Sequence, residues 1–204
     1  MSTPETSTLT SGTNERPTLA GKMFVGLQHV MPQHLLTSVV YSLTRSRAAF
    51  IKDALIGSFM RGFQPDMSDA VEPNPHAYAS FNDFFIRLLR PEARPIARGP
   101  GTLVSPVDGT ISQLGPIEGK QVFQAKGRHY SLDALLAGPP EWNARFTGGS
   151  FATLYLAPYN YHRIHMPLTG TLKAAWYVPG KLFSVNATTA SAVDSLFARN
   201  ERVV

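Results

Sequence analysis

The sequence of 204 residues contains no cysteine, which excludes a disulfide scaffold, a thiolate metal site and a cysteine nucleophile. It lacks any apolar run of about 20 residues, so it does not predict a transmembrane helix. Charged side chains make up only 16% of the residues, and 19 Lys and Arg outnumber 14 Asp and Glu, which gives a formal net charge of +5. A basic balance suits anionic partners such as lipid head groups or nucleic acid without choosing between them.

Common phosphate-binding and nucleophile motifs are also missing. The sequence holds no P-loop, no G-x-G-x-x-G and no G-x-S-x-G. Aromatic residues make up 10% of the chain but do not interleave with a basic run, so nucleic-acid binding has little support. What is present is a turn-rich chain, with 16 glycines and 16 prolines, whose length fits one domain with a small extension.

The N-terminal part of the chain has two sections of different composition. Residues 1–20 are rich in Ser, Thr, Pro and Glu, and we expect a disordered tail there. Residues 21–63 carry apolar side chains at helical spacing beside mostly basic charges, which predicts two amphipathic helices. Their apolar positions are Leu35, Leu36, Val39, Val40, Leu43, Phe50, Ile51, Ala54, Leu55, Phe59, Met60 and Phe63. Two roles stay open for these helices, packing on their own domain or lying in a membrane interface.

The remainder of the chain divides near residue 100. Residues 64–100 predict a linker and a short helix over 81–89 that Ser80 caps. From residue 101 short apolar runs alternate with Gly, Pro and Asn, which is typical of strands and turns. We expect strands at 102–104, 110–114, 121–125, 150–156 and 170–178, and short helices at 132–136 and 188–197. The predicted fold class is α+β, with amphipathic helices ahead of a sandwich-like or barrel-like β-rich domain over 101–204.

Asp108 is the first candidate for chemistry. It lies in the segment Ser105-Pro106-Val107-Asp108-Gly109, between two expected strands. An Asp before a Gly in a turn is commonly structural, because its carboxylate accepts hydrogen bonds from backbone N–H groups. A catalytic role stays open, because a carboxylate can also orient a histidine and stabilise its cation.

His162 and His165 are the second candidates, three residues apart in a segment bracketed by Pro158 and Pro167. A zinc site would need a third ligand that the sequence does not offer, so no metal is expected. Histidine titrates near neutral pH, which favours an acid–base role. Asp108 would form an acid–base pair with one of the two histidines if the fold brings them together.

Two further segments are weaker candidates. Residues 180–186 are interpreted as a loop entering a packed segment. Lys126 is interpreted as a solvated loop lysine, although lipoyl-type domains carry their prosthetic group on a lysine at a hairpin tip. A lipoyl-like carrier and a non-catalytic membrane-surface module are therefore the alternatives to an enzyme.

Taken in order, the motifs of this chain resemble those of the pyruvoyl-dependent phosphatidylserine decarboxylases of bacteria. The resemblance runs from about Met23 to the last residue. The motifs that carry it lie at 81–87, 94–96, 105–111, 124–127, 130–132, 161–167, 178–180, 183–186 and 197–202. One motif alone would be a weak signal, but the whole set with family-like spacing is highly specific.

The resemblance implies a proenzyme that cuts itself before the serine of a Leu-Gly-Ser-Thr motif and converts that serine into a pyruvoyl group on a small chain. The pyruvoyl carbonyl would form a Schiff base with phosphatidylserine, and loss of carbon dioxide would yield phosphatidylethanolamine for phospholipid biosynthesis. By the same resemblance, Asp108 and His165 would act in self-cleavage and His162 in decarboxylation and protonation. Tyr161 and Phe183 would join His162 in contacting the substrate.

The sequence departs from the family pattern in one respect, because it contains no Leu-Gly-Ser-Thr. Its Gly-Ser pairs, Gly57-Ser58 and Gly149-Ser150, lack the flanking residues of the family. We therefore expect the cofactor serine to lie beyond Val204 and this part of the large chain to be inactive alone. The implied partners are phosphatidylserine, an anionic membrane surface and the small chain, with a homodimer left open. The implied location is the cytoplasmic face of a bacterial cell membrane.

Overall fold

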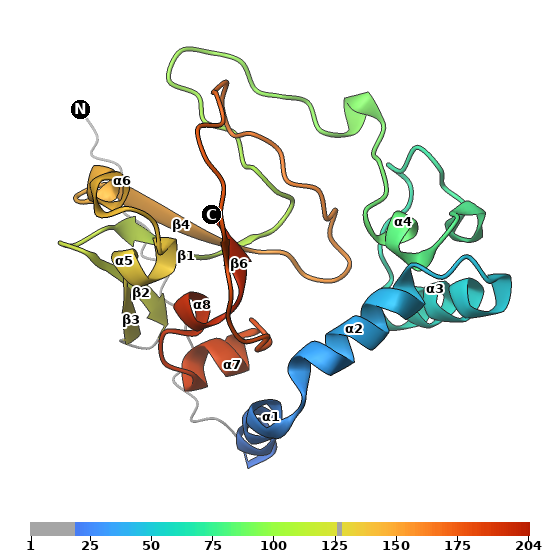
Figure 1. Cartoon of the computed structure of the whole chain (residues 1–204). Helices are drawn as coiled ribbons and strands as arrows, with labels where there is room; N and C mark the ends of the chain where they lie inside the picture. Colours follow the sequence, from blue (N-terminus) through green and yellow to red (C-terminus); the bar gives the residue numbers. More distant parts are fainter. Residues whose placement is uncertain (1–18, 126–127) are drawn as a thin grey trace, which may run out of the picture.

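A computed structural model describes residues 19–125 and 128–204 of the chain. Nearly all of the tail expected over 1–20 and the candidate Lys126 lie outside the described residues. Helices dominate before residue 100 and every named strand follows residue 109, which confirms the α+β class. Figure 1 shows the strands and the later helices on one side, α3 and α4 on the other, and α2 between them.

Three helices, and not two, form the N-terminal part: α1 (Leu19–Val30), α2 (Gln33–Thr44) and α3 (Ala49–Phe63). The apolar periodicity identified α2 and α3, whereas α1 was not predicted as a separate helix. Helix α2 buries none of its residues, and Leu35 keeps 66% of its surface exposed. None of the helices among the described residues has the length and apolarity needed to cross a membrane.

Helix α3 packs on the short helix α4 (Phe81–Phe85) through aromatic rings. The ring of Phe59 lies 5.8 Å from that of Phe84, which is fully buried together with Ile56. The predicted cap is confirmed, because the Ser80 hydroxyl accepts a hydrogen bond from the backbone N–H of Asp83. The helix ends earlier than expected because residues 88–90 leave it and pair with the backbone of 69–71.

The strands form three separate two-stranded antiparallel sheets. They pair β1 (Thr110–Pro116) with β4 (Ser150–Tyr155), β2 (Gln121–Ala125) with β3 (Arg128–Ser131), and β5 (Tyr177–Val178) with β6 (Arg202–Val203). The sandwich-like or barrel-like sheet does not form among the described residues. The expected strand at 102–104 and most of that at 170–178 find no ladder partner and run as irregular chain.

Short helices close the β-rich part on one side. Helix α5 (Leu132–Leu136) forms at the range that the sequence predicts, and the hydroxyl of Ser131 caps it. The remaining short helices are α6 (Pro140–Asn143), α7 (Ala187–Ala192) and α8 (Leu196–Arg199), with 3-10 turns η1 (Pro75–Ala77), η2 (Pro91–Ala93) and η3 (Ala144–Phe146). The single helix expected over 188–197 is thus two, separated at Ser195, whose φ is 52°.

Two apolar clusters form the core of this part. One gathers Ile117, Val122, Tyr130 and Leu132 beneath the β2–β3 hairpin. The other joins α1 to α7 and α8 through Val25, Phe183, Ala190, Val193 and Leu196. Buried Gln124 connects the hairpin with the α7–α8 turn. Its Nε2 donates to the carbonyls of Ala190 and Val193, and its Oε1 accepts from the N–H of Leu196, each at 2.8 Å.

We expect a side chain at Gly180 to destabilise the protein strongly, because the backbone of residues 199–201 passes close to it. A Cβ at this position would lie 2.5 Å from the carbonyl oxygen of Arg199 and 2.6 Å from the nitrogen of Glu201. Backbone atoms cannot turn aside as a side chain can, so Gly180→Ala should lower the free energy of unfolding by about 3 kcal/mol, measured by urea denaturation. The matched control is Gly62→Ala in α3, where a Cβ has open space. Equal stability of both variants would contradict the close approach.

Candidate functional site

A cavity of about 450 Å³ lies between two long segments of irregular chain, 89–108 and 161–166. Its volume is in the range of small-molecule sites. We call it the Asp108 cavity. Its lining residues are Leu89, Arg90, Pro91, Arg94, Pro95, Ile96, Val104, Ser105, Pro106, Val107, Asp108, Tyr161, His165 and Met166. Three of the residues singled out in the sequence therefore meet here, Asp108, Tyr161 and His165.

Backbone hydrogen bonds hold the two walls of the Asp108 cavity together. The N–H of His165 donates to the carbonyl of Pro106 at 2.8 Å, and the N–H of Val104 donates to Pro167 at 3.1 Å. The loops that carry these residues run through the upper part of Figure 1. Gly109 completes the turn, because a Cβ there would lie 2.8 Å from the carbonyl oxygen of Tyr155. The turn with Asp108 is thus fixed against the segment with His165 without regular secondary structure.

Arg94 holds the carboxylate of Asp108 in a two-pronged ion pair. Its Nε lies 3.0 Å from Oδ1 and its Nη2 lies 2.6 Å from Oδ2, while Nη1 binds Asp69 at 2.9 Å. The hydrogen bonds to Asp108, followed by those to Asp69, raise the pKa of Arg94 above its usual value. The two prongs engage both carboxylate oxygens, so Arg94 fixes the orientation of the Asp108 side chain in the cavity.

Arg94 is the site residue that sequence reasoning missed. Its one signal was its place in the family-like segment 94–96, which assigned it no role. It lies 14 residues before Asp108 in a stretch without regular helix or strand. Neither helical nor strand spacing could therefore predict that the two side chains meet. The Asp-Gly turn had suggested backbone partners for Asp108, whereas the structure provides this arginine.

His165 is held by a tyrosine. The hydroxyl of Tyr161 lies 2.9 Å from Nε2 of His165, and the two rings stack with centroids 5.5 Å apart. Tyr161 is buried, which fixes the position of its hydroxyl. Within the described residues Asp108 pairs with Arg94 and His165 pairs with Tyr161, so the acidic and the basic candidate share one cavity without a direct hydrogen bond.

His162 lies beside this cavity and does not line it. Its ring packs on Phe85 with centroids 4.1 Å apart, and its Nδ1 donates to the carbonyl of Asn160 at 2.9 Å. A carbonyl oxygen only accepts, so Nδ1 carries the proton and Nε2 is the lone-pair nitrogen of the neutral ring. This tautomer leaves Nε2 available for proton transfer.

Phe183 is not in this neighbourhood, contrary to the expected substrate pocket with Tyr161 and His162. It is buried in the apolar cluster that joins α1 to α7 and α8. Its backbone N–H donates to Oδ1 of Asn200, and Nδ2 of Asn200 donates back to its carbonyl. The ring therefore packs in this cluster, away from His162 and His165.

Two arginines connect α4 with the histidine segment. Arg87 is buried and donates from Nη2 to the carbonyl of Tyr159 at 3.3 Å, and its burial lowers the pKa of the guanidinium. Arg163 donates from Nε to the carbonyl of Ile86 at 2.7 Å. These contacts give the family-like segment 81–87 a structural role, because they position the chain that carries His162 and His165.

A metal centre has no support in the described part of the chain, which holds no cluster of three or more His, Cys, Asp or Glu residues. The groups that the Asp108 cavity does bring together, Asp108 with Arg94 and His165 with Tyr161, are candidates for acid–base chemistry.

Comparison with known proteins places these segments in a family. Residues 81–204 match the family model described as phosphatidylserine decarboxylase, and residues 23–64 match a model described as PSD. A phosphatidylserine decarboxylase proenzyme of Shewanella denitrificans is 53% identical over 180 residues, which cover 88% of this chain and 62% of that protein. The proenzymes of Shewanella amazonensis and Pseudomonas aeruginosa are also 53% identical, over 183 residues that cover 90% of this chain and 64% and 63% of theirs. The chain thus spans less than two thirds of the length of these relatives.

Proposed function

The chain belongs to the phosphatidylserine decarboxylase family, and on this premise we propose that it supplies the acid–base part of an active site that converts phosphatidylserine to phosphatidylethanolamine and carbon dioxide. The observation that carries the proposal is the meeting of Asp108, Tyr161 and His165 in one cavity. By the full-length protein we mean this chain together with the part that its relatives have and these 204 residues do not include.

We further propose that the cofactor is a pyruvoyl group, formed from a serine in a segment outside these 204 residues and carried on a small chain. A pyruvoyl carbonyl supplies the electron sink that removal of carbon dioxide from an α-amino acid requires. The Asp108 cavity fits a site for such a group, because its lining offers a carboxylate, an imidazole and a phenol beside apolar walls.

The acid–base work in self-cleavage would fall to the pair in the cavity. His165 would accept the proton of the attacking serine hydroxyl, as an imidazole does beside a nucleophile. Asp108, which Arg94 holds in place through both carboxylate oxygens, would stabilise the resulting imidazolium. Tyr161 would hold the ring through its contact with Nε2. His162, whose Nε2 is free of the Asn160 bond, would accept at Nε2 a proton that the substrate ammonium loses and would deliver it to the product carbon after carbon dioxide has left.

Helices α1 to α3 support a place at a membrane surface. Val30 and Leu35 keep 78% and 66% of their surface exposed, and further exposed apolar side chains follow along α2. Such a face beside basic residues is typical of helices that lie in the membrane interface. Since the proposed substrate is a lipid, we propose peripheral association with the cytoplasmic face of a bacterial cell membrane.

The proposed reaction is tested with the full-length protein and vesicles that contain phosphatidylserine labelled with ¹³C in the serine carboxyl group. We expect labelled carbon dioxide and an equal amount of phosphatidylethanolamine, both measured by mass spectrometry. Bound but chemically unchanged phosphatidylserine would contradict the proposed activity.

The membrane association has its own test, which uses the double variant Leu35→Glu and Val39→Glu. Two apolar side chains that insert into a bilayer contribute about 3 kcal/mol together, so vesicle affinity measured by co-sedimentation should fall by about a hundredfold. Ile111→Glu with Leu114→Glu makes the same kind of change at exposed positions of β1 and serves as control. Equal binding of the two double variants would refute the role of α2.

A further inference from the structure

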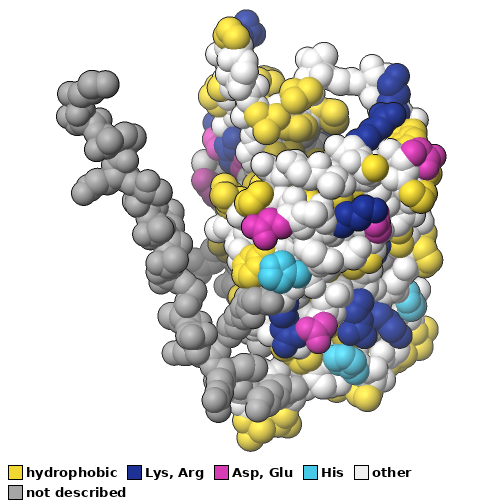
Figure 2. All heavy atoms as spheres, turned by 90° about the vertical axis from the view of Figure 1, so that its left-hand side faces the viewer, with side chains coloured by type: hydrophobic (Ala, Val, Ile, Leu, Met, Phe, Trp, Pro, Cys, Tyr) yellow, Lys and Arg dark blue, Asp and Glu magenta, His cyan; other side chains and the backbone are white. Residues whose placement is uncertain are grey.

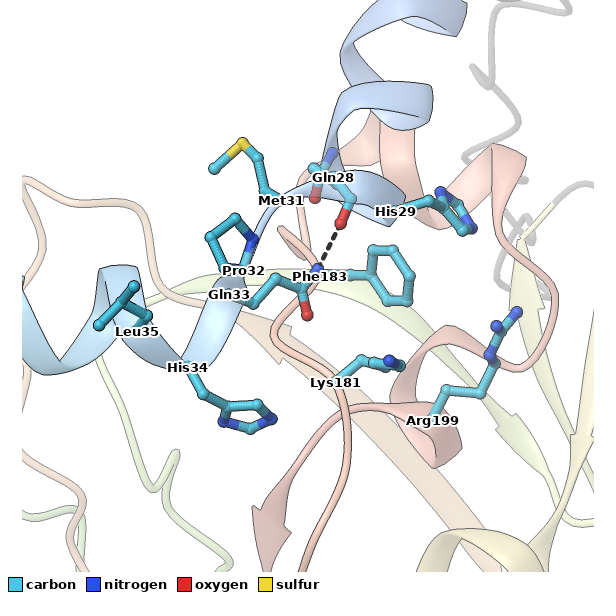
Figure 3. Close-up of a pocket in the computed structure, with 10 residues that line it drawn as sticks. All are labelled: Gln28, His29, Met31, Pro32, Gln33, His34, Leu35, Lys181, Phe183 and Arg199. Atoms are coloured by element: carbon cyan, nitrogen blue, oxygen red, sulfur yellow. Dashed lines mark hydrogen bonds between the residues drawn. The ribbon is translucent and has the colours of Figure 1, made fainter.

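A second cavity, of about 340 Å³, lies at the elbow between α1 and α2 and shares no lining residue with the Asp108 cavity (Figure 3). We call it the elbow cavity. Four of its lining residues have basic side chains, His29, His34, Lys181 and Arg199. No Asp or Glu is among the residues that line it. We propose that the elbow cavity binds a phosphate group, either that of a phospholipid head group or free phosphate.

The elbow cavity is held in shape by two glutamines. Oε1 of Gln28 accepts from the N–H of Ser184 at 2.7 Å, and Oε1 of Gln33 accepts from the N–H of Leu182 at 2.8 Å. Nε2 of Gln33 also donates to the carbonyl of Gln28 at 2.7 Å, the dashed line in Figure 3. These hydrogen bonds join the end of α1 to the start of α2 and both of them to residues 182–184. The basic side chains of the cavity therefore extend from segments that are bonded to one another.

Basic groups gather around the buried ring of Phe183 in this cavity. The imidazole of His29 lies 4.7 Å from that ring, and the guanidinium of Arg199 lies 5.6 Å above it. Nδ1 of His29 donates to the carbonyl of Val25 at 2.9 Å, which fixes the imidazole. Figure 3 shows Lys181 beside them, on the strand-like segment that leads to Phe183. Several donors therefore converge on one small volume.

The two permanent cations of the elbow cavity form no ion pair with Asp or Glu within the described residues. Elsewhere the pairing is common, as in Lys120 with Asp133 and Arg128 with Asp194. Figure 2 shows that Lys and Arg are interspersed with Asp and Glu on the face that carries β2, β3, α5 and α6. Lys181 and Arg199 thus offer unmatched positive charge in a concave site, which attracts an anion.

A phosphate group matches these donors better than a carboxylate. Its oxygens can accept charge-assisted hydrogen bonds from an ammonium, a guanidinium and an imidazole at the same time. At the rim of the cavity Leu35 begins the exposed apolar face of α2, which suits a phosphate that carries acyl chains. The inference does not depend on the proposed decarboxylation, because it uses none of the residues of the Asp108 cavity.

The test compares Lys181→Gln with Arg199→Gln against a matched double variant, Lys173→Gln with Arg145→Gln. Both remove two positive charges from exposed positions, and only the first pair lines the elbow cavity. One arm measures binding to vesicles of phosphatidylglycerol and phosphatidylcholine, and the other measures binding of inorganic phosphate by calorimetry. At about 1 kcal/mol for each basic residue, we expect affinity to fall at least tenfold for the cavity variant and less than threefold for the control.

The arm in which the loss occurs identifies the source of the phosphate. A loss confined to vesicles assigns a lipid head group, and a loss with inorganic phosphate assigns free phosphate. Lys181→Arg with Arg199→Lys keeps both charges and should keep the affinity within about threefold, which separates charge from a folding defect. Equal affinity of the cavity variant and the control in both arms would overturn the proposal.

Discussion

In the full-length protein, Asp108→Asn and His165→Gln should each leave a single uncut chain, whereas we expect the unaltered protein to separate into two. In the proposed mechanism Asp108 supplies the carboxylate that Arg94 orients and His165 supplies the base, so the loss of either would leave the serine without activation. Removing one member of such a unit commonly slows the reaction by a factor of about 10³ or more. Gel electrophoresis of freshly purified protein measures the fraction that has been cut.

Asp69→Asn provides the matched control for this experiment. Asp69 also binds Arg94, at 2.9 Å, but it does not line the Asp108 cavity. The control should be cut at a rate within a few fold of the unaltered protein, because Arg94 keeps its contacts with Asp108. Normal processing of both the Asp108 and the His165 variant would refute their assigned roles.

His162→Ala in the full-length protein should be cut normally and yet decarboxylate phosphatidylserine at least about 10² times more slowly. The reason is that Nε2 of His162 is the proposed proton carrier, and general acid–base catalysis of this kind contributes about 10² to 10⁴ in rate. Release of labelled carbon dioxide measures the effect, and the loss should appear in kcat more than in KM.

His129→Ala on β3 is the control for removal of an imidazole that packs on a phenylalanine. His129 lies 5.3 Å from the ring of Phe123, much as His162 packs on Phe85, but it belongs to the β2–β3 hairpin and not to the segment that carries Tyr161 and His165. Its variant should retain decarboxylation. An uncut His162→Ala chain would place His162 in self-cleavage instead, and unchanged carbon dioxide release would remove it from the chemistry.

Local signals in the sequence predicted the local structure well. Ser80 was predicted to cap a short helix and does so through its hydroxyl, and a helix forms at 132–136 as predicted, capped by the hydroxyl of Ser131. The strands near 110, 121 and 150 form where short apolar runs between turn residues predicted them. In each case the deciding interaction lies within a few residues along the chain, which is the distance over which sequence patterns are informative.

Long-range contacts decided the features that the sequence did not predict. The break at Ser195 depends on buried Gln124, whose Oε1 accepts from Leu196 across 72 positions of the chain. Phe183 was grouped with Tyr161 and His162 in the sequence, and the structure places it apart from them, in the apolar cluster that joins α1 to α7 and α8. The small separate sheets likewise depend on which strands find a partner, and a pattern of strands cannot show this.

The candidate site divides in the same way. Asp108 and His165 could be selected from their chemistry and from the family resemblance, and the structure places both in one cavity. Arg94 could not, because its ion pair with Asp108 depends on the path of an irregular loop. The direct pairing of Asp108 with a histidine was a hypothesis of the sequence, and the structure offers Arg94 and Tyr161 as the partners that hold each side in place.

The account rests on Asp108 and His165 acting as one unit in self-cleavage. The most direct test measures the half-time of cleavage in the full-length protein for Asp108→Asn, His165→Gln and the double variant, followed by intact mass. If the two residues form one unit, the double variant is no slower than the slower single variant. Slowdowns that multiply in the double variant would show that the two residues act independently, which would contradict the account.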